Sequence, residues 1–75
     1  MSVKKIKLRE VNDVKEFVNA AEKCDYDVDI WYNRIIIDAK SLMGVLSLDL
    51  TKELTVKYNE EDIHFNDILD KYVVS

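Results

Sequence analysis

The spacing of the apolar residues constrains the fold of this chain more than any other feature, because it alternates between the period of a strand and the period of a helix. Ile6 and Leu8 alternate with basic residues and predict a half-buried strand over residues 5–9. Alternation recurs further along the chain, and a β-prone run follows a predicted tight turn at Asn33-Arg34. Arg34 suits a type I′ hairpin turn less well than glycine would. The later predicted strands cover residues 28–32, 35–39 and 54–58.

Helical spacing separates these strands. In the first helical segment the apolar residues form a single stripe, and Asn12 or Asp13 precedes it as a candidate N-cap. Asp13 with Glu16 would form an aspartate version of the capping box. The last segment has apolar residues at i, i+3, i+4 and i+7, which predicts a final helix. The two stripes are Val14, Phe17, Val18 and Ala21, and Phe65, Ile68, Leu69 and Tyr72.

The predicted elements follow one another as β-α-β-β-α-β-α, and no proline, repeat or low-complexity stretch interrupts them. The 75 residues are 48% hydrophobic and 35% charged, which is typical of one small globular domain covering residues 1–75. Amphipathic elements in this order can close a single core only when the helices cover one face of an antiparallel sheet. The sequence therefore predicts an α/β fold of the α+β type.

The second helix is predicted within residues 40–48, which hold the chain's only glycine. Ser41 follows a β-prone run and precedes good helix formers, so its hydroxyl can accept a hydrogen bond from a backbone N–H of the first turn. Val45 and Leu48 fall on one face of that helix. A second face is also apolar, which predicts a docking surface beside a serine that a kinase could phosphorylate. That second face consists of Leu42, Met43 and Leu46.

Residues 40–48 read Lys-Ser-Leu-Met-Gly-Val-Leu-Ser-Leu and resemble the segment Lys-Ser-Ile-Met-Gly-Val-Met-Ser-Leu of HPr, the small carrier protein of the bacterial sugar phosphotransferase system. Tyr32-Asn33 matches the Tyr-Asn before the hairpin turn of that family, and the resemblance runs without a gap to about Leu48. It implies an open-faced two-layer sandwich with sheet order 1-4-2-3. It also implies that Ser41 occupies the position that HPr kinase/phosphorylase phosphorylates in Gram-positive relatives.

The chain departs from the HPr pattern between the first strand and the first helix. HPr proteins carry their phosphoacceptor there in a Gly-Ile-His-Ala-Arg-Pro segment, where free N–H groups and an arginine steady a phosphoryl group. In the same register, Glu10 replaces the histidine, Asn12 the arginine and Asp13 the proline. Because two carboxylates should repel a phosphoryl donor, the carrier activity of the family is expected to be absent, and the chain is not expected to be an enzyme.

The other chemically reactive side chains do not form a recognisable site. His64 lies near the start of the last helix and is expected to be an ordinary surface or capping residue, and Cys24 a small packing residue. One histidine and one cysteine 40 residues apart lack the spacing of metal ligands, so no metal or other cofactor is expected. Glu10 and Asp13 could act as an acid–base pair, but solvated carboxylates at a helix start are the favoured interpretation.

Charge and composition restrict the classes of partner. The net charge of −4 argues against nucleic acid, and the basic residues Lys4, Lys5, Lys7 and Arg9 are interpreted as the solvated face of a strand. The N-terminus has no apolar signal segment, and no run approaches the length of a membrane span. The single cysteine suits a reducing compartment. A cytoplasmic protein without membrane contact is therefore expected.

Three functional hypotheses follow. The first is a regulatory module similar to the histidine-less HPr-like protein of catabolite repression, switched at Ser41 and bound by HPr kinase/phosphorylase or a transcription regulator. The second is a degenerate HPr-fold interaction domain in which Ser41 is only a helix cap. An exposed Trp31 and the apolar helix face would then contact an unknown protein or a second copy, so the chain would be a monomer or a weak homodimer. The third is a phosphocarrier that uses an unconventional residue.

Overall fold

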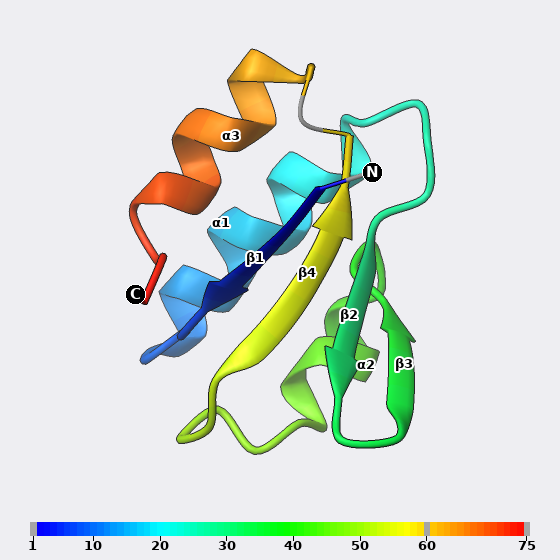
Figure 1. The fold of residues 1–75 in the computed structure, drawn as a ribbon. Helices are drawn as coiled ribbons and strands as arrows, with labels where there is room; N and C mark the ends of the chain where they lie inside the picture. The colour runs from blue at the N-terminus through cyan, green and yellow to red at the C-terminus, as the bar shows by residue number, and fades with distance from the viewer. Residues whose placement is uncertain (1, 60, 75) are drawn as a thin grey trace.

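Four antiparallel strands form one layer of the molecule and three helices cover one face of it (Figure 1). The computed structural model describes residues 2–59 and 61–74. The sheet order is β1-β4-β2-β3, so the predicted α/β class and the strand order implied by the HPr resemblance are both confirmed. The strands are β1 (Ser2–Ile6), β2 (Asp29–Tyr32), β3 (Ile35–Asp38) and β4 (Leu54–Tyr58), and the helices are α1 (Val11–Glu22), α2 (Leu42–Leu46) and α3 (Ile63–Asp70).

The hydrophobic core lies between the sheet and the helices. Alternate residues of β4 are buried, as its period of two predicted, and the predicted stripe of α1 is buried along its whole length. Phe65 of α3 packs between the two layers, with its ring centroid 6.0 Å from that of Phe17 and 5.7 Å from that of Tyr58. None of the helices among the described residues has the length and apolar character that crossing a membrane requires.

Helix α1 begins earlier than the sequence indicated. Its N-cap is Glu10, so the prediction that Asn12 or Asp13 caps this helix is wrong. Asp13 is the third residue of the helix, and its side chain accepts a hydrogen bond from the backbone of the N-cap residue. The capping box therefore joins Asp13 to Glu10 rather than to Glu16, because Asp13 reaches back toward the preceding turn.

Strand β1 pairs over residues 2–6 rather than 5–9, because Ile6 is the last residue opposite β4. The basic residues that follow one another here do not share one face. Lys4 forms an ion pair with Asp70 of α3 at 2.7 Å, whereas Lys5 is exposed and Lys7 lies beyond the strand. The interpretation of these lysines as one solvated strand face is therefore wrong.

Asn33 and Arg34 form the predicted tight turn between β2 and β3. Asn33 is the only non-glycine described residue with a positive φ, at 53°. Asparagine tolerates this left-handed conformation better than most residues. Arg34 does not adopt it, and this is why the turn forms without a glycine.

Candidate functional site

Ser41 caps the start of α2, as predicted. Its backbone is extended, and its Oγ accepts a hydrogen bond from the backbone N–H of Gly44 at 3.1 Å. The residue is exposed, and its own backbone N–H donates to the carbonyl of Asp38 at 3.0 Å. The hydroxyl thus serves a local structural role while remaining accessible from solvent.

Helix α2 has two apolar faces, of which one is buried and the other is exposed. Val45 and the following Leu48 are buried against the rest of the core. Gly44 lies close to β3, since a Cβ at this position would be 3.0 Å from Cγ2 of Ile37. The remaining apolar side chains stay exposed, and 81% of the Met43 surface is accessible. We call Leu42, Met43 and Leu46 the α2 face.

The loop before α1 is held by a carboxylate of the chain itself. Oδ2 of Asp13 accepts hydrogen bonds from the backbone N–H groups of Arg9 at 3.1 Å and Glu10 at 3.2 Å. Glu10 is exposed at the start of the helix. An external phosphoryl group could accept hydrogen bonds from these two N–H groups only by displacing Asp13. It would also be repelled by the carboxylate of Glu10.

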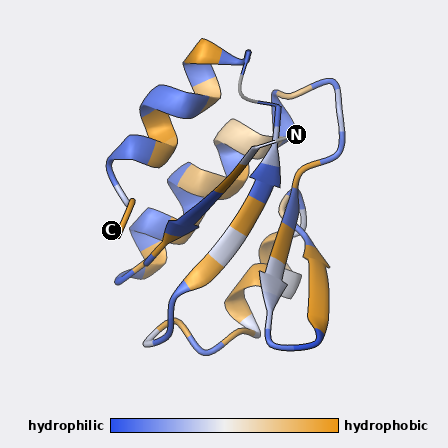
Figure 2. Cartoon of the chain, viewed as in Figure 1, coloured by the Kyte–Doolittle hydropathy of each residue, from blue (hydrophilic) through white to orange (hydrophobic). Residues whose placement is uncertain are grey.

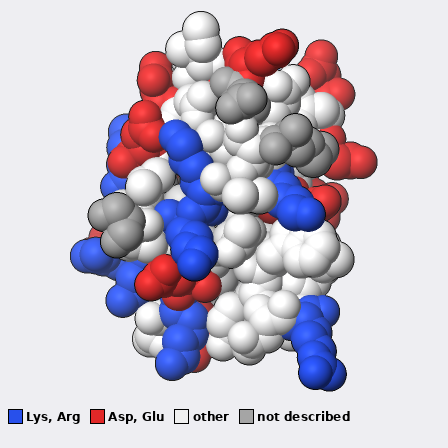
Figure 3. Space-filling view, viewed as in Figure 1, with Lys and Arg blue, Asp and Glu red and all other residues white. Residues whose placement is uncertain are grey.

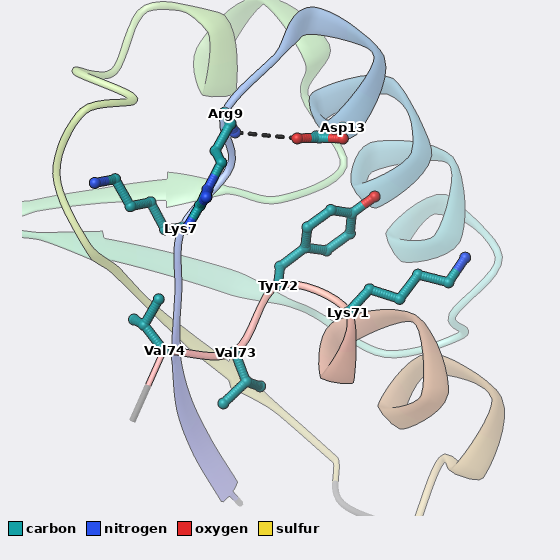
Figure 4. Close-up of a pocket in the computed structure, with 7 residues that line it drawn as sticks. All are labelled: Lys7, Arg9, Asp13, Lys71, Tyr72, Val73 and Val74. Atoms are coloured by element: carbon teal, nitrogen blue, oxygen red, sulfur yellow. Dashed lines mark hydrogen bonds between the residues drawn. The ribbon is translucent and has the colours of Figure 1, made fainter.

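A hollow of about 370 Å³ lies beside this loop (Figure 4). Lys7 and Arg9 approach it from the segment after β1, whereas Lys71 and Tyr72 come from the chain after α3. The Lys71 ammonium is paired with Glu16 at 3.0 Å, and the Tyr72 hydroxyl also donates to Glu16. These two hydrogen bonds, chiefly that from Tyr72, hold the pKa of Glu16 below its ordinary value. The lining residues are Lys7, Arg9, Asp13, Lys71, Tyr72, Val73 and Val74.

A second hollow, of about 280 Å³, connects this loop with the segment after α2. Lys7 and Arg9 form one side of it, and Leu50 and Thr51 form the other. The start of α1 and the chain that leaves α2 are thus neighbours. Neither Ser41 nor the α2 face lines this hollow.

Comparison with known proteins agrees with this arrangement. A family model described as "PTS HPr component phosphorylation site" matches residues 10–65, which is most of the chain. The chain belongs to the PTS-HPr family. It is also similar to the crystal structure of a phosphocarrier protein HPr from Bacillus anthracis str. Ames, with 17% sequence identity, a TM-score of 0.63 and 95% of each chain covered. At this identity the similarity shows the shared fold. No curated protein gives a significant match.

HPr proteins are phosphocarriers rather than catalysts in themselves, and they interact with other proteins of the phosphotransferase system. The only histidine of this family member is His64, which is exposed in the first turn of α3. Asp62, the N-cap of α3, accepts hydrogen bonds from Cys24 and Tyr26, which follow the C-terminal end of α1. Because a helix of 12 residues is about 18 Å long, His64 lies far from Glu10, at the other end of α1.

The remaining candidate side chains of this HPr-family chain are Cys24, the possible metal ligands and Trp31. Cys24 is buried, and burial raises the pKa of its thiol, which disfavours a role as a nucleophile. Among residues 2–59 and 61–74 no group of histidine, cysteine and acidic side chains could hold a metal ion. Trp31 is half-buried rather than exposed as expected, with the Lys57 ammonium 4.0 Å from its ring centroid and its Nε1 buried without a partner.

The sequence predicted the cap at Ser41 and the exposure of the α2 face, since both depend on local spacing. It missed the hollow of Figure 4, because Lys71 and Tyr72 are distant in sequence from Lys7 and Arg9. Part of a signal was present, since Lys7 and Arg9 belong to the basic stretch near the N-terminus. No local pattern connects that stretch with the residues that follow α3.

Proposed function

We propose that this HPr-family protein is a non-catalytic, protein-binding regulator of the sugar phosphotransferase system, without a phosphohistidine and switched by phosphorylation at Ser41. The observation that carries the proposal is the position of the one histidine. His64 lies at the far end of α1 from the loop where the family resemblance expects a phosphoacceptor, and Glu10 is the residue at that loop. A carrier of the ordinary kind would need an imidazole beside the start of α1.

The charges of the loop before α1 also argue against a phosphoacceptor in this loop. Asp13 already accepts the N–H groups of Arg9 and Glu10, so the loop holds an internal anion where a phosphoryl group would need donors. Lys7 and Arg9 line the adjoining hollow, but neither of these two side chains is an imidazole that could carry a phosphoryl group. Incubation with phosphoenolpyruvate and enzyme I should therefore give no acid-labile phosphoprotein.

The surroundings of Ser41 support regulation by phosphate. The hydroxyl is exposed, and the apolar α2 face begins at the next residue. The neighbouring Lys40 ammonium is engaged with the carbonyl of Cys24 at 2.9 Å, while Asp38 adds negative charge beside the serine. A phosphate of about two negative charges would thus find little compensation within the chain and would be recognised by cations of a protein partner.

The test is intact-mass analysis after incubation with ATP and HPr kinase/phosphorylase. We expect one phosphate on the parent protein and on Ser47→Ala, and none on Ser41→Ala. Ser47 is a matched control, because it is exposed at the other end of α2 and its Oγ also bonds to Gly44. Labelling that survives in Ser41→Ala, or its absence from the parent, would contradict the switch.

The second candidate function is a degenerate HPr-fold interaction domain in which Ser41 only caps α2. The hydrogen bond from Gly44 to Oγ favours it, since such a bond alone accounts for a serine at this position. In that case Ser41→Ala would lower the free energy of unfolding by about 1 kcal/mol and no phosphate would be found on either protein. The third, a carrier with an unconventional residue, requires the acid-labile phosphoprotein that we expect to be absent.

A further inference from the structure

The two edge strands of the sheet, β1 and β3, differ in whether another segment pairs with them. The segment after α3 covers the C-terminal end of the β1 edge, where Val73 lies opposite Ile6 and the N–H of Val74 donates to the carbonyl of Lys5 at 3.0 Å. Strand β3 forms the other edge (Figure 1), and no segment of residues 2–59 or 61–74 pairs with its outer side. An unpaired edge strand is a template for pairing with another chain.

The backbone of Ile36 is directed to this free edge. In an antiparallel pair, alternate residues exchange hydrogen bonds with the neighbouring strand. The N–H of Ala39 donates to the carbonyl of Val28 at 2.9 Å. In the register of β2 and β3, the backbone groups of odd-numbered residues on the β3 side therefore hydrogen-bond to β2. The N–H and the carbonyl of Ile36 therefore both point away from β2.

The edge of β3 carries little protection, because Asp38 is the only charged residue of the strand. Natural edge strands commonly carry lysine, proline or a bulge that prevents pairing. Residues 35–37 are all isoleucine, and 53% of the Ile36 surface is exposed. Figure 2 shows β3 as a hydrophobic strand at the margin of the sheet, and Figure 3 shows an uncharged surface over this part of the open sheet face.

We propose that β3 pairs antiparallel with β3 of a second copy of this chain, about a two-fold axis at Ile36. In this register each Ile36 exchanges two backbone hydrogen bonds with Ile36 of the partner subunit. Ile35 lies opposite Ile37 of the partner subunit, and Arg34 lies opposite Asp38 of the partner subunit. The two sheets then become one continuous sheet of eight strands, four from each copy.

Charge complementarity favours a second copy of this chain as the partner of β3, and it favours the register about Ile36. Residues 34–38 read Arg-Ile-Ile-Ile-Asp, so antiparallel self-pairing brings each positive end against a negative end. Within one copy, Asp38 lies directly opposite Asp29, and like charges in this position are destabilising. Lys57 lies on the other side of Asp29, but no described residue forms an ion pair with Arg34 or Asp38. The Asp38 carboxylate accepts a hydrogen bond from the backbone N–H of Lys40 at 2.9 Å, and self-pairing adds an opposite charge for both Arg34 and Asp38.

The open face of the sheet gains an apolar row in the same arrangement. Ile36 lies opposite Trp31 of β2, so both side chains are on the face that the helices leave uncovered. Pairing about Ile36 would place the two isoleucines between the two tryptophans. Because only one short strand of each copy takes part, the interface is small and the dimer should be weak and concentration-dependent.

Sedimentation velocity over a roughly hundredfold range of concentration up to about 1 mM tests the proposal. We expect reversible dimerisation of the parent protein and its loss in Ile36→Lys, which places like charges at the two-fold axis. Val3→Lys is the matched control, because Val3 is 57% exposed and lies on β1 at the opposite edge of the sheet. A parent that stays monomeric, or a dimer that Val3→Lys abolishes or Ile36→Lys preserves, would overturn the proposal.

A charge exchange tests the register. Arg34→Asp and Asp38→Arg should each be monomeric, since both homodimers would oppose like charges. An equimolar mixture of the two should dimerise, because every pair of opposed side chains is then of opposite sign. Association in the mixture also shows that both variants are folded. A mixture that stays monomeric, while each variant retains the parent circular dichroism spectrum, would refute this register.

Discussion

Asp13 is the residue on which the local structure before α1 depends. It satisfies two backbone N–H groups that no helical hydrogen bond can reach, those of Arg9 and Glu10. Its negative charge also lies in the first turn of α1, where the helix dipole favours it. The same carboxylate therefore stabilises the helix start and occupies donors that a phosphoryl group would use.

Replacing Asp13 by alanine should lower the free energy of unfolding by about 1 kcal/mol, because both N–H groups lose their acceptor. Urea denaturation followed by circular dichroism measures this difference. Asn12→Ala is the control, since Asn12 is the adjacent residue, is exposed and makes no side-chain hydrogen bond. Equal stabilities of the two variants would show that the Asp13 hydrogen bonds contribute nothing.

At the scale of the element, α2 is a short helix that is apolar on two faces. Val45 and the close approach of Gly44 to Ile37 fix it on the sheet. The exposed residues of the α2 face do not take part in this packing, and the proposed function assigns them to contact with another protein. A five-residue helix cannot be stabilised by its own propensity, and its stability comes from the buried face.

Met43→Glu should slow phosphorylation of Ser41 by HPr kinase/phosphorylase roughly tenfold or more, which corresponds to about 1.4 kcal/mol of lost contact. The fold should be unaffected, because Met43 is 81% exposed. Leu46→Glu should act in the same direction. Ile63→Glu serves as the control, since Ile63 is 74% exposed on α3, outside the α2 face. If Ile63→Glu slows the reaction equally, the effect is one of net charge and the α2 face is not the docking surface.

At the scale of the whole molecule, two carboxylates attach the C-terminal part of the chain to the region of α1. Glu16 of α1 binds Tyr72 and Lys71 after α3. Asp62 caps α3 by accepting the N–H of Phe65 at 3.0 Å, and it also accepts from Tyr26 after α1. The pKa of Asp62 is lowered chiefly by the backbone hydrogen bond from Phe65, and the pKa of Glu16 chiefly by the bond from Tyr72.

These shifts predict acid-sensitive stability. A carboxyl whose pKa is lower in the folded state stabilises the fold above its unfolded pKa of about 4, and this contribution is lost as the pH falls through the folded pKa. The free energy of unfolding should therefore decrease below about pH 4. The double variant Glu16→Gln, Asp62→Asn should show a shallower decrease in urea titrations at several pH values. Glu22→Gln, at an exposed residue of α1 without a side-chain hydrogen bond, should keep the parent slope.

Much of the fold was predictable from local pattern. The stripe of α1 from Val14 to Ala21 and the alternation of β4 specify which face of each element is buried, because these periods are properties of a single segment. The cap at Ser41 was predictable for the same reason. The start of α1 was not, because Asp13 reaches back to Glu10 instead of capping the helix itself, and the residue type alone allows both.

The order of the elements, their buried faces, the resemblance to HPr and the lack of a histidine before α1 can all be read from the amino-acid sequence. Three features become visible only in the folded chain: Lys7 and Arg9 share a hollow with Tyr72, His64 lies at the other end of α1, and the edge of β1 is covered at its C-terminal end while that of β3 is free. The difference lies in the range of the interactions. Periodicity and capping act over a few neighbouring residues, whereas the bond between Tyr72 and Glu16 joins residues 56 positions apart and forms only when the sheet and helices pack.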